Sequence, residues 1–294
     1  MSGAAPSQPD QISIRRAVAA DVAACAPICF EAFRQIAERH NFPLEIPVPE
    51  IPAAMLSMMF SHPGFFCVVA EQNGTILGSN CLDERSVIAG VGPITVSPSE
   101  QNRSIGRRLM RAVMDRASER GCPGVRLVQA GYNTRSLSLY AKLGFAVREP
   151  LACMLGPAIR QSISGFHVRR ADIADVEACS ALARRVHGHN REGELRDAIA
   201  QGSAVLVESR GRITGYASSV AFFGHAVAET NDDLEAILAA APEIPRPGIL
   251  VPTRNASLVR WCLEHGLRVI TPMNLMAFGL YNEPAGAFLP SITF

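Results

Sequence analysis

The sequence lacks a long apolar segment and has no marked excess of charge of either sign. Its 294 residues include 28 Lys and Arg against 27 Asp and Glu, so the formal net charge at pH 7 is only +1. No apolar stretch reaches the roughly 18 residues that a membrane-spanning helix needs. A chain so close to neutral gives no electrostatic reason to expect nucleic acid or an anionic membrane as a partner. The sequence predicts neither of these partners.

A targeting segment and a metal-binding set of cysteines are also missing. Residues 1–11 are small and polar, without the basic and apolar regions of a signal peptide, so we expect a disordered tail and a cytoplasmic protein. Eight cysteines are scattered along the chain. Cys25 and Cys29 are four residues apart on an expected helix, but no neighbouring residues complete a zinc site. We expect buried free thiols, with disulfides or a metal as the less favoured alternative, and no metal cofactor.

Two common nucleotide-binding motifs are absent from the sequence. There is no GxxxxGK segment followed by Ser or Thr, which excludes the usual P-loop. Gly90-Val91-Gly92 lies inside an expected strand, so it does not begin a dinucleotide-binding GxGxxG motif.

The chain contains two pairs of similar segments. Residues 15–25 and 169–179 are identical at eight of eleven positions, and each follows a short apolar strand pattern and leads into a helical one. Residues 127–145 and 250–267 each combine an apolar strand, an Asn that can cap a helix, and a Gly that can end it. Because both pairs occur in the same order, we interpret the chain as a duplication.

Each half of the chain predicts an α/β fold. Helical patterns alternate with short β-rich segments, and Asn73-Gly74 is a hairpin turn signal. The prediction is a mixed, mostly antiparallel sheet flanked by helices in each of two tandem domains, residues 12–158 and residues 165–294. The apolar C-terminal segment, residues 284–294, is expected to pack across the other half or a partner subunit.

An expected helix that starts near Ser104 has positive charge concentrated at its beginning. Arg103, Arg107 and Arg108 surround this point, although a helix start already exposes unpaired N–H groups and about half a positive charge. A bound phosphate or diphosphate would satisfy both the amides and the arginines, and the small residues Ser104 and Gly106 would let it approach the backbone. A solvated basic helix face is the alternative.

The same segment resembles motif A of the GCN5-related N-acetyltransferases. That motif is a V-x-P strand end followed by a glycine-containing loop that opens a helix. Here residues 96–98 read Val-Ser-Pro, and Gln101 and Gly106 follow in register. Ser104 stands in place of the middle glycine of the motif, which is a departure from the family pattern.

Downstream, Asn133 and residues 139–145 resemble motif B of the same family, and the likeness covers residues 12–156. The resemblance implies acetyl-CoA or another acyl-CoA as co-substrate, with its diphosphate on backbone amides of residues 103–108 and its pantetheine arm along the preceding strand. The residues that it assigns to coenzyme binding are Ile94, Val96, Pro98, Gln101, Arg103, Ser104, Ile105, Gly106, Arg107, Asn133 and Tyr140.

The resemblance also gives Tyr140 a catalytic role, protonation of the leaving thiolate. A phenol with a pKa of ~10 can donate to a thiolate whose conjugate acid has a pKa of ~8.5. The general base is less clear, because the expected strand over residues 88–96 has no ionisable side chain. Asp83 and Glu84 are the nearest carboxylates in the sequence, and we expect Glu84 to act through a water molecule. A turn held by Asp83 and Arg85 is the alternative.

The second half lacks the basic loop. Asp232 and Asp233 occupy the first turn of the corresponding helix, where they suit the helix dipole but would repel a diphosphate. Trp261 or Cys262, depending on a one-residue gap, takes the place of Tyr140, and neither is a comparable acid. We therefore expect a degenerate second domain without a donor site.

The function implied by the resemblance is transfer of an acetyl or other acyl group from acyl-CoA to an amine. The acceptor is a small-molecule or peptide amine that the sequence does not identify. The second domain is expected to enclose the acceptor cleft or to support a homodimer. An acyl-CoA-binding sensor and a structural protein, both without turnover, are the alternatives.

Overall fold

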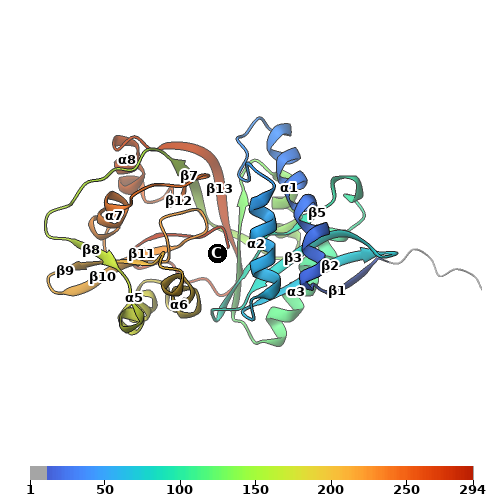
Figure 1. Ribbon diagram of the computed structural model, residues 1–294, viewed down its shortest axis with the longest axis horizontal. Coiled ribbons are helices and arrows are strands. Elements are labelled where there is room, and N and C mark those ends of the chain that lie inside the picture. Colours follow the sequence, from blue (N-terminus) through green and yellow to red (C-terminus); the bar gives the residue numbers. More distant parts are fainter. Residues whose placement is uncertain (1–11, 294) are drawn as a thin grey trace, which may run out of the picture.

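The computed structural model describes residues 12–293, which form two lobes side by side (Figure 1). The expected tail at residues 1–11 lies outside the described residues. Within residues 12–293, no helix combines the length and apolar character needed to cross a membrane. The same residues contain no group of His, Cys, Asp and Glu side chains that could hold a metal ion.

The first lobe is built from the first half of the chain. The Asn73-Gly74 turn has positive φ at both residues, which is the conformation that a two-residue hairpin turn requires. Its elements are β1 (Ser13–Arg16), α1 (Val22–Arg39), α2 (Glu50–Ser61), β2 (Phe65–Gln72), β3 (Thr75–Asp83), β4 (Ile88–Val91), β5 (Thr95–Val96), α3 (Ile105–Glu119), β6 (Gly124–Ala130), α4 (Thr134–Lys142) and β7 (Ala146–Leu155).

The second lobe is built from the second half and repeats the alternation of strands and helices. Its elements are β8 (His167–Arg170), α5 (Val176–His187), α6 (Glu192–Ala200), β9 (Val205–Ser209), β10 (Arg212–Ala217), β11 (Ala226–Ala228), α7 (Asn231–Ala240), β12 (Ile249–Pro252), α8 (Ala256–Glu264), β13 (Arg268–Gly279) and β14 (Ala287–Leu289).

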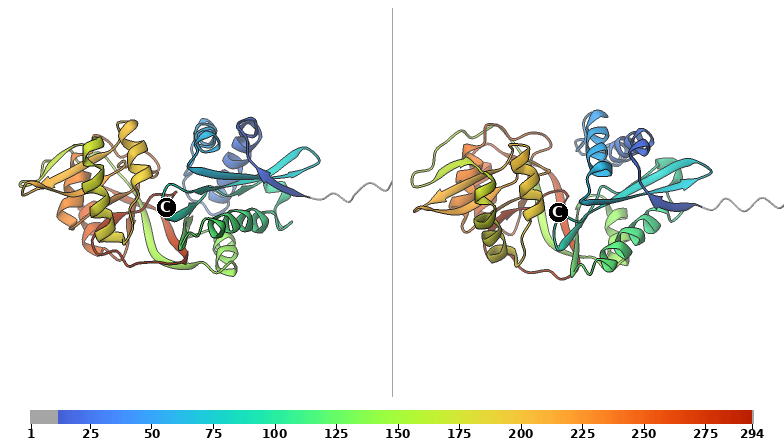
Figure 2. Two further views of the ribbon diagram at one scale, coloured as in Figure 1. Left: turned by 90° about the horizontal axis from the view of Figure 1, so that it is seen from below. Right: turned by 60° about the horizontal axis from the view of Figure 1, so that its bottom comes forward.

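The strands form two sheets, which confirms the predicted mixed α/β fold. One sheet has nine strands in the order β1-β2-β3-β4-β6-β13-β7-β12, with β5 paired to β3, and the other has the order β14-β11-β10-β9-β8. All pairs are antiparallel except β4 with β6. In the first lobe, α1 and α2 cover one face of the sheet and α3 covers the other (Figure 2). Apolar side chains fill both layers between helices and sheet, which is how such a sheet buries both faces.

The nine-stranded sheet contains strands from both halves of the chain. β13 of the second half lies between β6 and β7 of the first half, and β7 in turn pairs with β12 of the second half. Each half therefore contributes a strand to the part of the sheet that adjoins the other. The division into domains at residues 12–158 and 165–294 stays a prediction, but strands from the two sides of it pair with each other by hydrogen bonds.

One ion pair occurs at the same place in both halves. Arg15 contacts both carboxylate oxygens of Asp21 at 2.7 and 2.9 Å, and Arg169 contacts those of Asp175 at 2.7 and 2.8 Å. Each pair joins the first strand of its half to the start of the following helix. A bidentate contact of this kind fixes geometry as well as charge, which explains why the similar segments at residues 15–25 and 169–179 fold alike.

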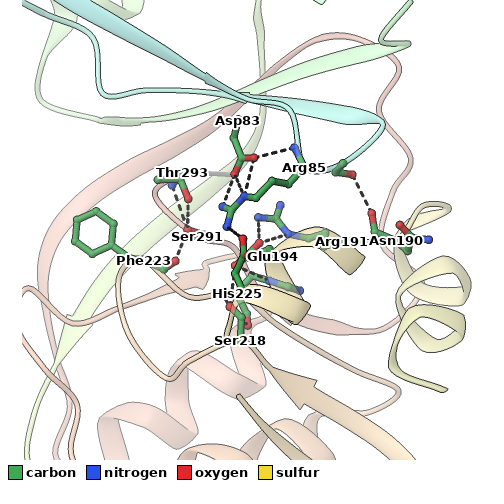
Figure 3. A network of polar contacts seen from close by, with 12 residues as sticks. Asp83, Arg85, Asn190, Arg191, Glu194, Ser218, Phe223, His225, Ser291 and Thr293 are labelled. Carbon is green, nitrogen blue, oxygen red and sulfur yellow. Dashed lines mark hydrogen bonds and ion pairs between the residues drawn. The ribbon is translucent and has the colours of Figure 1, made fainter. Parts of the chain in front are cut away.

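Polar contacts also join the two halves beside the shared sheet (Figure 3). Arg85, just after β3, binds Asp83 and reaches Asp197 of α6 at 2.8 Å. Ser86 donates a hydrogen bond to the carbonyl oxygen of Asn190 at 2.9 Å. These contacts hold the end of β3 against the second lobe. All eight cysteines lie among the described residues as free thiols, and all but the half-buried Cys122 are buried.

Candidate functional site

The site begins where two parallel strands separate. β4 and β6 pair as far as Gly90 and Arg126. Pro93 follows, which has no N–H to donate to a ladder, and the chain then moves away from β6 so that β5 pairs with β3. Because β6 continues to Ala130, an opening is left between the diverging strands. The single strand that the sequence predicts over residues 88–96 is therefore wrong in this detail, because the chain breaks there.

The start of α3 lies beside this opening and has no cap of its own. Ser104, the N-cap residue, has φ 61° and accepts no hydrogen bond with its side chain. The first backbone bond of the helix runs from the N–H of Arg108 to the carbonyl of Ser104 at 3.1 Å. Among the described residues, the N–H groups of Ile105, Gly106 and Arg107 have no partner. These three donors and the positive end of the helix dipole suit an anion.

A cleft of about 690 Å³ opens over these donors. Its other walls are the C-terminal part of α1, the segment that ends in β5 and the first turns of α4. Every residue that the sequence assigns to coenzyme binding lines it except Pro98 and Arg103. The cleft also receives basic side chains that the sequence analysis did not single out: Arg39, Arg135 and Lys142.

Arg103 is not among the residues that line the cleft, so its position does not support its assigned role in coenzyme binding. It pairs with Glu100 and donates a hydrogen bond to the side-chain oxygen of Gln72 at 2.8 Å. The contact ties the loop before α3 to the end of β2. Of the three arginines around the helix start, only Arg107 lines the cleft.

Arg135, on the first turn of α4, holds the same loop from the other side. It donates hydrogen bonds to the side-chain oxygens of Gln101 at 2.6 Å and Asn102 at 2.8 Å. Asn133 caps α4 by accepting a hydrogen bond from the N–H of Ser136 at 3.1 Å. In the sequence, the only indication that Arg135 lies beside the loop is its position two residues after the predicted cap Asn133.

Tyr140 lies deep in the site, on α4. Its side chain is buried and lines both the cleft and a smaller inner cavity. Burial raises the pKa of its hydroxyl well above the usual value, so the group is a neutral O–H donor at physiological pH. The catalytic role of Tyr140 stays a prediction.

Glu84 lies elsewhere, and its assignment as general base is a misplacement. It follows β3 and accepts hydrogen bonds from Arg116 at 2.7 Å and Arg120 at 2.6 Å, near the C-terminal end of α3. Burial raises the pKa of its carboxyl, but the two arginines outweigh this effect and lower it. The turn held by Asp83 and Arg85, the alternative for this segment, is present. Proximity in sequence failed here because Glu84 is at the opposite end of α3 from the cleft.

Replacement of Glu84 by Gln is therefore expected to affect stability and not catalysis. Loss of the charged contacts should lower the free energy of unfolding by about 1–2 kcal/mol, since the two arginines are partly exposed. Because folding lowers the pKa of Glu84, its contribution is present above the unfolded pKa of ~4.3 and disappears as the pH falls below it. Urea unfolding at pH 7 and pH 3.5 would show this, with exposed Glu119→Gln as control. An equal stability loss at both values would contradict it.

The inner cavity contains a carboxylate that the sequence analysis missed. The cavity measures about 150 Å³ and lies beside the cleft, between residues 91–94 and β6. Glu45, from the connection between α1 and α2, lines it. Burial raises the pKa of Glu45 to about 7, although a hydrogen bond from Tyr132 opposes the shift. A lone acidic residue in the proline-rich segment of residues 42–49 was the only available signal.

The corresponding helix of the second half, α7, has no free start. Only two residues connect it to β11, and Thr230 and Asp233 cap it reciprocally, with the Thr230 N–H at 3.1 Å from the Asp233 carboxylate. Cys262 occupies the place of Tyr140, since it follows the cap Asn255 by seven residues as Tyr140 follows Asn133. Its thiol is buried in the core.

Comparison with known proteins agrees with this geometry. Residues 30–145 match the model of the acetyltransferase (GNAT) family. A curated relative, an IAA acetyltransferase from Azospirillum brasilense, is 31% identical over 92 residues, which make up 31% of this chain and 60% of that protein. The chain therefore spans only about 60% of the length of this relative.

Two solved structures share the whole two-lobed fold. A candidate acetyltransferase from Pyrococcus horikoshii has a TM-score of 0.74 at 18% identity, over 98% of both chains. A GCN5-related N-acetyltransferase from Sphaerobacter thermophilus has a TM-score of 0.59 at 15% identity, over 94% of this chain and 98% of that one. At these identities the likeness shows the fold alone.

The strand opening, the uncapped helix start and the matched segment all lie in the first half of the chain. Residues 30–145 of this half are similar to the acetyltransferase (GNAT) family.

Proposed function

We propose that the protein transfers an acyl group, acetyl in the simplest case, from acyl-CoA to an amine. The observation that carries the proposal is the uncapped start of α3, which faces a cleft large enough for a nucleotide. The inner cavity, beside the opening between the diverging strands, adjoins this cleft. The diphosphate binds the N–H groups of Ile105, Gly106 and Arg107, and the charge of Arg107 adds to this contact. The pantetheine arm follows β5 into the opening.

Tyr140 serves as the general acid of this reaction. Tyr140 lines both the cleft and the inner cavity, and this position supports a role for its hydroxyl at the sulfur of a thioester that enters through the cleft. Protonation of the departing thiolate prevents its return to the acyl carbon. A positioned acid of this kind contributes about 100-fold or more to a rate.

Tyr140→Phe is expected to lower kcat by about 100-fold while the Kd for coenzyme A stays the same. Phenylalanine keeps the edge contact with Phe145, whose ring centroid lies 6.2 Å away, so the helix packing is preserved. Thiol release from acetyl-CoA with an amine panel gives kcat, and calorimetry gives the Kd. An unchanged kcat would remove Tyr140 from the mechanism.

The proposed activity itself is tested with the intact wild-type chain. Calorimetric titration with coenzyme A and release of free thiol from acetyl-CoA in the presence of amines are both expected. Binding without turnover across a broad panel would show a sensor, and absence of binding would show that the cleft has another purpose.

A further inference from the structure

The inner cavity is enclosed by both halves of the chain. Ile94, Asn133 and Tyr140 line it as well as the cleft, so the two spaces adjoin each other. Phe222 and Phe223, from the connection between β10 and β11, close it from the second half. An apolar space of about 150 Å³ is large enough for a benzene ring. The cavity can therefore hold one six-membered ring or one short branched alkyl chain.

The C-terminal segment holds this wall in place (Figure 3). The hydroxyl of Ser291 donates a hydrogen bond to the carbonyl oxygen of Phe223 at 2.9 Å, and the N–H of Ile292 donates to that of Phe222 at 2.9 Å. Ile292 itself lines the cavity. The second half thus completes a pocket whose donor side belongs entirely to the first.

Glu45 is the one charged residue among the described residues that line the cavity. The hydroxyl of Tyr132 lies 3.5 Å from its Oε1 atom, and the ring centroids of His40 and Tyr132 are 5.5 Å apart. Cys153 on β7, whose thiol pKa is raised by burial and by Glu45, is the other titratable neighbour. A single carboxylate in apolar surroundings attracts an amine and disfavours an anionic ligand.

A second polar group marks the cavity as a ligand site. Gln129 on β6 is 5% exposed and lines the cavity. Its side-chain oxygen accepts a hydrogen bond from Ser136 at 3.2 Å, but its amide nitrogen has no partner among the described residues. A buried donor left unpaired destabilises the folded state. An occupant with a hydrogen-bond acceptor, such as the carbonyl oxygen of a thioester, removes this cost.

We infer that this cavity binds the acceptor, a small amine with an apolar body of about one ring, and that Glu45 is its general base. The inference rests on the proposed function and deepens it, because it assigns the acceptor class and the base. The amine enters past Phe223, which is 41% exposed at the rim, and its apolar part lies against Phe222 and Ile292. The donor reaches the same space from the cleft.

The reaction then balances over two protein groups. The lone pair of the neutral amine forms the new C–N bond with the acyl carbon, and the C–S bond breaks. Glu45 takes a proton from the amine nitrogen, and the thiolate takes one from Tyr140. The net result is one amide and one thiol, and solvent restores the two side chains. With a pKa of about 7, Glu45 is ionised and able to accept a proton above neutral pH.

Glu45→Gln tests the base through pH profiles of kcat/KM with benzylamine. The wild-type value is expected to exceed that of the variant about 100-fold at pH 8, and the ratio should fall as the pH drops below 7. Ionisation of the amine cancels in this ratio. Glu45→Asp should recover part of the activity, and exposed Glu50→Gln is the matched control. A ratio that stays near one at every pH would overturn the assignment.

The acceptor class is tested with a panel of benzylamine, isobutylamine, lysine and spermidine. The first two are expected to have KM values at least tenfold lower, and Phe223→Ala should raise the KM for benzylamine without changing the Kd of coenzyme A. Leu263→Ala removes a similarly exposed apolar side chain outside the cavity and serves as control. Equal KM values across the panel would overturn the inference. Coenzyme binding and turnover in these same assays would still support the proposed function, so the two failures are distinguishable.

Discussion

Gly106→Glu is expected to abolish binding of coenzyme A at concentrations that saturate the wild type. The substitution places a carboxylate in the first turn of α3, among the N–H groups that face the cleft. Repulsion between like charges costs several kcal/mol, and each 1.4 kcal/mol corresponds to a factor of ten. The Kd should therefore rise about 100-fold or more. A carboxylate suits the positive end of a helix dipole, so the fold should be unaffected.

Two further substitutions at the same position separate charge from bulk. A Cβ atom at Gly106 would lie 3.6 Å from Leu139 and 3.8 Å from Val96, which are ordinary contact distances. Gly106→Ala should therefore bind with a Kd within a few-fold of the wild type. Gly106→Gln, which has the size of Glu without its charge, should be intermediate. Calorimetry gives the Kd and circular dichroism checks folding. A folded Gly106→Glu variant with the wild-type Kd would contradict the proposed diphosphate site.

Residues 12–158 expressed alone are expected not to yield a folded monomer. In this fragment β6 loses β13, and β7 loses both of its neighbours, β13 and β12. The exposed strand edges present unpaired N–H and C=O groups, and β7 also carries buried apolar residues such as Leu151 and Met154. We expect aggregation, or a dimer in which one copy supplies the missing strand to another.

Co-expression of residues 12–158 with residues 159–294 provides the matched comparison. The two fragments together contain β7 and β13 and lack only one peptide bond of residues 12–294. We therefore expect a folded 1:1 complex that binds coenzyme A. Size-exclusion chromatography and calorimetry are the measurements. If residues 12–158 alone elute as a folded monomer and bind coenzyme A with the wild-type Kd, the pairing of β6 and β7 with strands of the second half is not needed for stability.

Much of the fold is encoded locally, and that part is visible in the sequence. The Asn73-Gly74 hairpin, the caps at Asn133 and Asn255 and the strand-to-helix ion pair of Arg15 with Asp21 involve residues near one another in the chain. The pairing of β7 with β13, which joins strands of the two halves, is not encoded locally. Their pairing joins segments more than a hundred residues apart, and their apolar patterns fit either partner equally well.

The same contrast between local and long-range contacts applies to the candidate site. The end of β5, the loop and the start of α3 lie within one short segment, so motif and spacing could predict a donor site there. The sequence pointed to Glu84 as the base because it is near the motif in the chain, whereas Glu45, the base we propose, lines the cavity from a connection whose course depends on the packing of α1 and α2. Arg103 was misassigned for a related reason, since its partner Gln72 belongs to a hairpin outside the motif.

Under the proposed function, the capped beginning of α7 determines how many coenzyme molecules each chain binds. Although the architecture is repeated, Asp233 supplies the negative charge at this helix from within the chain, and the first turn of α7 is complete without any ligand. Of α3 and α7, only α3 has a start without a side-chain cap. One equivalent of coenzyme should therefore saturate each polypeptide, and the second lobe is left to shape the space in which the other substrate is held.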